Sequence, residues 1–147
     1  ALIPKGMSRF YLDEAESLQA CIPGAGGVFT ARSLAKIYAA LANHGEIDGV
    51  RLLSEKTVRE LVKVQNRNRG DVVPMAMHWR LGYHRVFTTW PKTPYAFGHF
   101  GYGGSGAWAD PSRHLAVGYI VNTGSGSPFA DLRIWKINTA IIDAVGG

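Results

Sequence analysis

The sequence predicts an α+β fold in which helices pack on an antiparallel β-sheet. Apolar residues recur at helical spacing in the first half of the chain and again near its end. Between residues 79 and 122, short alternating or continuous apolar runs are separated by turn residues, as in an antiparallel meander. The 18 glycines and the charged fraction of 18% also favour packed strands and tight turns over a solvated helix bundle.

Each expected helix begins at a capping residue. Thr30 is a predicted N-cap, and Asn43-His44-Gly45 ends the helix with Gly45 in a left-handed conformation. The apolar stripe between these two ends consists of Leu34, Ile37, Tyr38 and Leu41. Ser54 is expected to cap a second helix over 57–64, and residues 129–145 predict a closing helix.

The strands are expected at residues 79–87, 95–100, 106–110 and 115–122. Residues 111–114, Pro-Ser-Arg-His, predict the turn between the last two strands. A sheet with so few strands has an edge that is expected to be unpaired or to be covered by a partner.

The length of 147 residues and the hydrophobic fraction of 46% suit one domain, 1–147, with residues 1–27 as an irregular lead-in. The chain does not begin with Met and its first residues lack a signal-peptide pattern, so we expect a fragment of a larger domain. No apolar run reaches the ~18 residues of a membrane span, so no span is expected. The sequence assigns no cellular compartment.

Charge and cysteine content exclude some classes of function. The net charge of +5 is scattered, and its densest cluster, Arg67-Asn68-Arg69, is expected in a solvated loop. A nucleic-acid-binding domain would need a basic stripe interleaved with aromatic residues, so we expect no nucleic-acid partner. Cys21 is the single cysteine and is expected to be a semi-buried residue without catalytic use. His78 and His84 could share a strand face, but without a third ligand we expect no metal and no cofactor.

Two serines imitate catalytic motifs. Ser105 lies in Gly103-Gly104-Ser105-Gly106-Ala107, which lacks the last glycine of G-x-S-x-G and precedes a strand instead of a helix. Ser33-Leu34-Ala35-Lys36 spells S-x-x-K, but two specified residues in four often match by chance. We expect Ser105 to be a turn residue and Lys36 an ordinary surface residue.

The chain resembles the C-terminal part of the serine β-lactamase-like superfamily, specifically its branch of class C β-lactamases and penicillin-binding-protein-like esterases. Three blocks carry the resemblance, in the family's order: IPGAGGVFTARSLAKIYAALANHGEIDGVRLLSEKTVREL, LGYHRVF and FGHFGYGGSGAWADPSRHLAVGYIVN. The resemblance covers residues of about 22 to 145 and implies the C-terminal portion of the β-lactamase/transpeptidase-like fold.

The family lines its cleft with three motifs, S-x-x-K, Y-x-N and K-T-G or H-x-G. By resemblance, His99-Phe100-Gly101 is the third motif. The resemblance makes three residues catalytic: His99, Gly101 and Tyr102, whose backbone N–H would be one oxyanion donor. Phe100 and Gly103 would contact the substrate. The side chains of Phe100 and Tyr102 would add an apolar rim. Ser33 lies too close to His99 for the family's spacing and no Y-x-N occurs, so the other two motifs are expected upstream.

The resemblance therefore implies a C-terminal fragment of a serine hydrolase, an esterase or β-lactamase-like enzyme that acts on a small ester or amide through an acyl-enzyme. The upstream half of the same protein would be its partner, and the chain alone is expected to be inactive. The alternative is a non-catalytic binding module that offers an exposed sheet edge to another chain or to itself.

Overall fold

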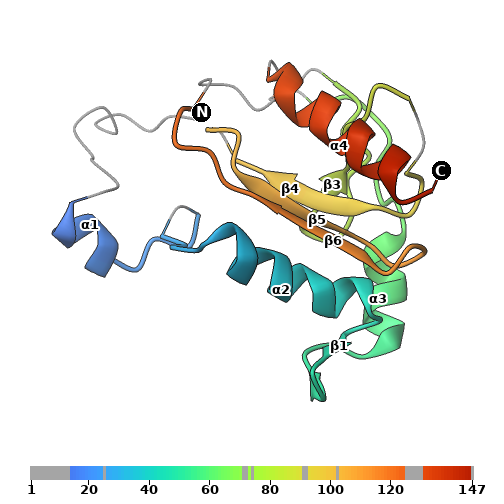
Figure 1. Cartoon of the computed structure of the whole chain (residues 1–147), viewed down its shortest axis with the longest axis horizontal. Coiled ribbons are helices and arrows are strands. Elements are labelled where there is room, and N and C mark those ends of the chain that lie inside the picture. The colour runs from blue at the N-terminus through green and yellow to red at the C-terminus, as the bar shows by residue number, and fades with distance from the viewer. Residues whose placement is uncertain are drawn as a thin grey trace.

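A four-stranded antiparallel sheet lies between two helices (Figure 1). The computed structural model describes residues 14–24, 26–70, 73, 75–90, 93–101, 103–124 and 131–146. The sheet has the order β3-β4-β5-β6, and its strands are β3 (His84–Arg85), β4 (Phe97–Phe100), β5 (Gly106–Asp110) and β6 (Leu115–Tyr119). Because each strand pairs with its neighbour in sequence, the sheet is a meander.

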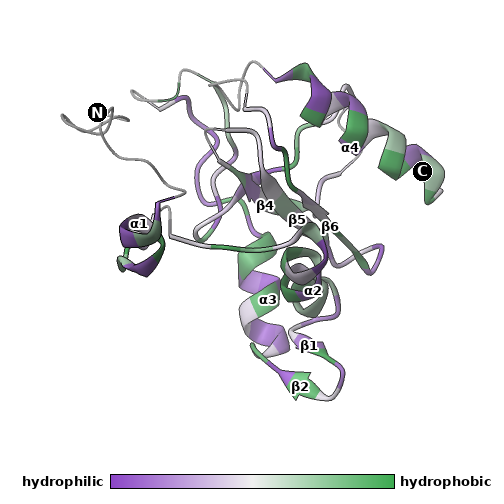
Figure 2. Ribbon diagram, turned by 60° about the vertical axis from the view of Figure 1, so that its left-hand side comes forward, coloured by the Kyte–Doolittle hydropathy of each residue, from purple (hydrophilic) through white to green (hydrophobic). Residues whose placement is uncertain are grey.

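The helices divide between the two faces of this sheet. Helix α4 (Leu132–Ala144) covers one face, and α2 (Ala31–Ala42) covers the other (Figure 1). Helix α3 (Glu55–Val62) lies next to α2 (Figure 2). A small hairpin, β1 (Glu46–Ile47) with β2 (Val50–Arg51), connects α2 to α3, and the short α1 (Ala15–Gln19) precedes them. The predicted α+β class is confirmed.

The α4 face of the sheet holds the larger core. Its buried residues are Val86, Ala96, Phe100, Trp108, Ile134 and Ile142. Asn138 of α4 is buried among them: its side-chain oxygen accepts from Trp108 Nε1 at 2.9 Å, and its nitrogen donates to the Phe87 carbonyl at 3.0 Å. This one side chain satisfies two buried polar groups and fixes α4 against the sheet.

The second core lies under α2 and α3. Its buried residues are Leu41, Ala42, Leu61, Phe97 and Ala109. Helix α2 approaches β6 so closely that a Cβ added at Gly118 would lie 2.3 Å from the Ala31 carbonyl oxygen. A glycine at this position is therefore a requirement of helix–sheet packing.

Several predicted boundaries are confirmed. Thr30 caps α2, Ser54 caps α3, and the predicted strand 106–110 and turn 111–114 lie where expected. Gly45 has φ +99° and donates its N–H to the Ala40 carbonyl at 2.7 Å, which is the predicted helix end.

The predicted strand over residues 79–87 is wrong for most of its length. Gly82 has φ +80°, so the chain bends there and β3 begins only at His84. Leu132, in the first turn of α4, is 65% exposed. Helix α1 and the β1–β2 hairpin have no counterpart in the prediction, since neither has a strong apolar period.

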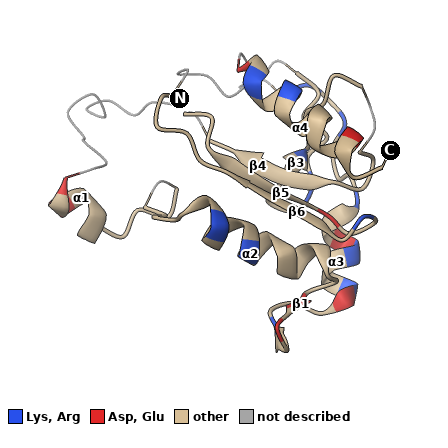
Figure 3. Cartoon of the chain, in the orientation of Figure 1, with Lys and Arg blue, Asp and Glu red and all other residues tan. Residues whose placement is uncertain are grey.

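The surface agrees with a scattered charge pattern. Figure 3 shows Lys and Arg on α2 and on α4, with the sheet between them. Among the described residues, no helix has both the length and the apolar character to cross a membrane.

Candidate active site

Strand β4 presents His99 to solvent while it buries the residues on either side. Phe97, Gly98 and Phe100 are buried, and His99 is exposed. Side chains alternate along a strand, so His99 lies on the same face as Phe97, the face covered by α2 and α3, whereas Phe100 points to the α4 face. The H-x-G segment therefore projects one polar side chain from an otherwise buried strand.

Small residues beside His99 leave its ring open on that face. In the sheet register His99 lies opposite Ala107 of β5, and Ala107 lies opposite Gly118 of β6. Neither has a side chain long enough to cover the imidazole. Ala107 is itself buried and Gly118 packs under α2, so in this row only His99 is exposed.

His84 ends the pairing between β3 and β4. The ladder pairs His84 with Gly98 and Arg85 with Phe97, and goes no further. The next outward N–H, that of Phe100, donates instead to His84 Nε2 at 3.2 Å. Beyond Phe100, this edge of β4 has no strand neighbour among the described residues.

The tautomer of His84 follows from its two partners. Nδ1 lies 2.7 Å from the Arg85 carbonyl oxygen, which can only accept, so Nδ1 carries the proton. Nε2 then accepts the Phe100 N–H, and a protonated ring would lose that bond. The pKa of His84 is lowered to about 4, mainly by burial. The charges of His99, Arg80 and Arg85 lower the pKa further, while the hydrogen bond to the Arg85 carbonyl raises it. The ring is therefore neutral near pH 7.

His99 and His84 contact each other, with ring centroids 5.2 Å apart. Partial burial lowers the pKa of His99 below its usual 6.5. Near pH 7 the His99 ring is therefore neutral and can donate or accept a hydrogen bond. The lowered pKa favours an uncharged ring on this side of the strand.

A tight turn follows the H-x-G segment. Gly101 donates its N–H to the Ser105 carbonyl at 2.8 Å, and Gly104, with φ +97°, donates to the Gly101 carbonyl at 3.0 Å. The Ser105 hydroxyl oxygen accepts the Val121 N–H at 3.0 Å. Ser105 thus joins the β4–β5 turn to the end of β6, in line with its expected role as a turn residue.

The remaining predicted site residues lie in different surroundings. Gly101 is half-buried and Gly103 is exposed. The Phe100 ring is 4% exposed and packs in the core under α4, so it does not form the apolar rim that we expected from it. Tyr102 lies outside the described residues.

The side chains of Ser33 and Lys36, the S-x-x-K pair, both make structural contacts. Ser33 and Thr30 form a capping box, in which each side chain accepts the other residue's N–H, at 3.0 and 3.1 Å. Lys36 is exposed and forms an ion pair with Asp48 at 2.6 Å. In the described structure Lys36 is therefore a surface residue, and Ser33 begins a helix.

No metal centre forms in the part of the chain that the structure describes, since no group of three or more His, Cys, Asp or Glu side chains converges there. His78 and His84, which the sequence could place on one face, have different surroundings: His84 is buried, whereas His78 has φ +49° and is half-buried. Cys21 is exposed instead of semi-buried.

Comparison with known proteins agrees with the fold. The model of the Beta-lactamase family matches residues 3–140, and the chain belongs to this family. The esterase/beta-lactamase LipL of Mycobacterium tuberculosis (strain ATCC 25618 / H37Rv) is 45% identical over 116 residues, which are 74% of this chain and 25% of that protein.

Two solved structures resemble the chain. A family VIII carboxylesterase has 34% sequence identity and a TM-score of 0.62, covering 70% of this chain and 28% of that one. A penicillin-binding protein homolog from Caulobacter crescentus has 33% identity and a TM-score of 0.62, covering 77% and 32%. The chain thus spans about a quarter to a third of the length of these relatives.

Proposed function

We propose that this chain supplies one wall of the active site of a serine hydrolase that cleaves a small ester or amide. The observation that carries the proposal is the exposure of His99 on the otherwise buried β4, next to a strand edge without a neighbour. The names of the relatives, an esterase/beta-lactamase and a carboxylesterase, support the same class of reaction.

In the proposed reaction, a serine from a preceding segment attacks the substrate carbonyl and forms an acyl-enzyme, which water then hydrolyses. The contacts of Ser33 and Ser105 support a nucleophile from elsewhere, because both hydroxyls already hold structural positions. The neutral His99 ring would hydrogen-bond the substrate beside the reacting carbonyl.

The proposal also assigns an oxyanion donor. Backbone N–H groups alternate between the two edges of a strand: Phe100 donates towards the β3 edge and Gly101 towards β5. By the family resemblance we propose that the N–H of Tyr102, which follows these two residues in the chain, would stabilise the developing oxyanion. Gly101, without a side chain, would let the substrate approach the backbone.

The outer edge of β6 supports the proposal that a preceding segment of the protein is the partner of this chain. β6 is the last strand of the described sheet and pairs only with β5 there. We propose that a strand from the upstream half of the same protein pairs with this edge, since an exposed strand edge is usually covered.

The test is His99→Ala in a longer protein that contains this chain, with His114→Ala as matched control. Loss of a hydrogen bond in the transition state predicts a fall in kcat/KM for p-nitrophenyl butyrate of about 10- to 100-fold. His114 is an exposed turn residue, and its variant should keep the activity. Equal activity of the two variants would remove His99 from the site.

A further inference from the structure

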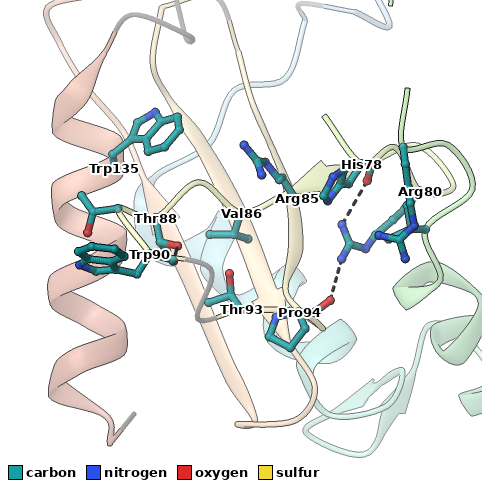
Figure 4. Close-up of a pocket in the computed structure, with 12 residues that line it drawn as sticks. His78, Arg80, Arg85, Val86, Thr88, Trp90, Thr93, Pro94 and Trp135 are labelled. Atoms are coloured by element: carbon teal, nitrogen blue, oxygen red, sulfur yellow. Dashed lines mark hydrogen bonds between the residues drawn. The ribbon is translucent and has the colours of Figure 1, made fainter. Parts of the chain in front are cut away.

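A cavity of about 570 Å³ opens beside β3, and neither His99 nor Gly101 lines it (Figure 4). Its walls come from the chain after α3, from residues 78–94 and from α4. Its volume is within the usual range of small-molecule sites, about 300–1,000 Å³. The proposed function assigns no role to this cavity.

The charged residues of the cavity wall are all basic. Arg67, Arg80 and Arg85 line it together with His78, and none of the described lining residues is Asp or Glu. In the described part of the chain, the ion pairs involve other arginines and lysines, and none includes these three. Among the described residues, the positive potential of this cavity therefore has no compensating carboxylate.

Arg80 forms the fixed part of this wall. Its side chain is buried and donates to three carbonyls, those of Val62 at 2.9 Å, Pro94 at 3.0 Å and His78 at 3.3 Å. These bonds join the end of α3 to two loops. Burial lowers the pKa of Arg80, and the charge of Arg67 lowers it further. Burial also lowers the pKa of His78, and the charges of Arg85, Arg67 and Arg80 add to that shift.

Two buried donors of the wall lack an acceptor. Among the described residues, Arg85 Nε and Trp135 Nε1 are the buried side-chain nitrogens without a hydrogen-bond partner. A buried donor left unpaired costs about 1–3 kcal/mol. Both groups can only donate, so the missing partner is an acceptor.

One aromatic ring holds these two donors in place. Phe87 stacks on Trp135 with centroids 5.1 Å apart at 19°, and the Arg85 guanidinium carbon lies 5.3 Å from the centre of the same ring. Phe87 is itself buried. Arg85 and Trp135, from β3 and α4, are thus positioned together before any ligand binds.

We propose that this cavity is a binding site for an organic carboxylate whose apolar body lies against Trp90 and Trp135. A carboxylate supplies the acceptors that Arg85 Nε and Trp135 Nε1 lack. Trp90 is 67% exposed and, with Val86 and Pro94, offers apolar surface to the rest of the ligand. Since Arg85 Nε and Trp135 Nε1 are screened from water as they stand, both side chains must shift slightly when the carboxylate binds.

The test is a titration of the 147-residue chain with benzoate, followed by calorimetry and tryptophan fluorescence, with neutral benzamide as isostere. Benzoate should bind saturably and change the fluorescence, and benzamide should bind at least about tenfold more weakly, because it lacks the charge. Equal binding of both, or no binding by chain that unfolds cooperatively on heating, would overturn the proposal.

Three variants locate the site. Trp135→Phe keeps an aromatic ring for Phe87 and removes Nε1, and Arg67→Gln removes an exposed charge at the cavity mouth. Each should weaken benzoate about five- to tenfold. Arg32→Gln makes the same charge change on the exposed surface of α2 and should bind as the unchanged chain does. Equal affinity of Arg67→Gln, Trp135→Phe and Arg32→Gln would contradict the assignment.

The same titration on a longer protein identifies the source of the carboxylate. Binding by both proteins would indicate a free small molecule. Binding by the 147-residue chain alone would indicate that an Asp or Glu of a preceding segment occupies the site. If the 147-residue chain does not unfold cooperatively on heating, Arg67→Gln is tested in the longer protein instead. Both sources of the carboxylate, a free molecule and a side chain of a preceding segment, are overturned if this variant leaves the benzoate affinity and the melting temperature unchanged.

Discussion

His84 controls the end of β4 through two hydrogen bonds and a neutral ring. It accepts the Phe100 N–H, donates to the Arg85 carbonyl and lies against His99. The surrounding rings of Trp79, Phe87 and Phe100 exclude water from it. In this position it acts as a positioning residue for the H-x-G segment, without contact to the proposed substrate.

This arrangement predicts a pH dependence of folding stability. The pKa of His84 is about 4 in the folded chain and 6.5 when unfolded, so the unfolded chain binds more protons between these values. The free energy of unfolding should therefore fall as pH drops from 6.5 to 4, by up to about 3 kcal/mol from this residue. Urea unfolding at a series of pH values measures it.

Two variants separate His84 from the other titrating groups. His84→Gln places a side-chain oxygen near the Phe100 N–H and cannot protonate, so it should lose most of this pH dependence. His114→Gln, on an exposed turn, should retain it. Identical slopes in the two variants would mean that His84 is not the group responsible.

Residue types alone could not reveal this role. His84 was visible as a histidine in an alternating run, but its acceptor function depends on Phe100, sixteen residues away. The H-x-G motif was visible because its residues are contiguous, and the exposure of His99 follows from strand alternation. The burial of Phe100 was not predicted, because the sequence does not indicate which face α4 covers.

At the scale of elements, the start of α2 explains why Ser33 occupies an S-x-x-K pattern. Its side chain accepts the Thr30 N–H in a capping box, which satisfies one of the donors at the helix start. Ser33→Ala should therefore lower the free energy of unfolding by about 1 kcal/mol. Glutamate also suits this capping position, so Ser33→Glu should be within about 0.5 kcal/mol of the unchanged chain. An equal loss in both variants would refute the capping role.

The contact between α2 and β6 predicts a larger effect. A methyl group at Gly118 would also lie 2.9 Å from the Ala35 nitrogen, so Gly118→Ala must push the helix away from the strand. Overpacking of this kind costs about 1–3 kcal/mol, measured as a shift of the urea midpoint. Gly24→Ala, where no atom lies within 4 Å of the added carbon, is the control and should have little effect.

Elements with strong local signals were predictable from the sequence. Thr30 and Ser54 have capping side chains, and the turn at 111–114 contains a proline, so their positions were found. The strand predicted at 79–87 is too long because Gly82 fits the alternating pattern of the sequence. The positive φ of Gly82, which bends the chain there, cannot be recognised from that pattern. β3 is short, and its ladder with β4 ends where the Phe100 N–H donates to the His84 side chain instead of to a backbone carbonyl.

At the scale of the whole molecule, the sheet places the candidate site at the end of β4, and its described edge strands, β3 and β6, leave room for further chain. The matched part of this chain covers about a quarter to a third of the length of each relative. The family and the fold class were predictable from three sequence blocks. The other walls of the site were not, because we propose that a preceding segment of a longer protein supplies them.

The central claim is that the chain provides a wall of the active site and no nucleophile. The most direct measurement is hydrolysis of p-nitrophenyl butyrate by the purified 147-residue chain, beside Ser33→Ala and Ser105→Ala. We expect no turnover above the uncatalysed rate in any of the three, because both hydroxyls hold backbone N–H groups. Robust turnover by the unchanged chain that disappears in Ser33→Ala would contradict the claim.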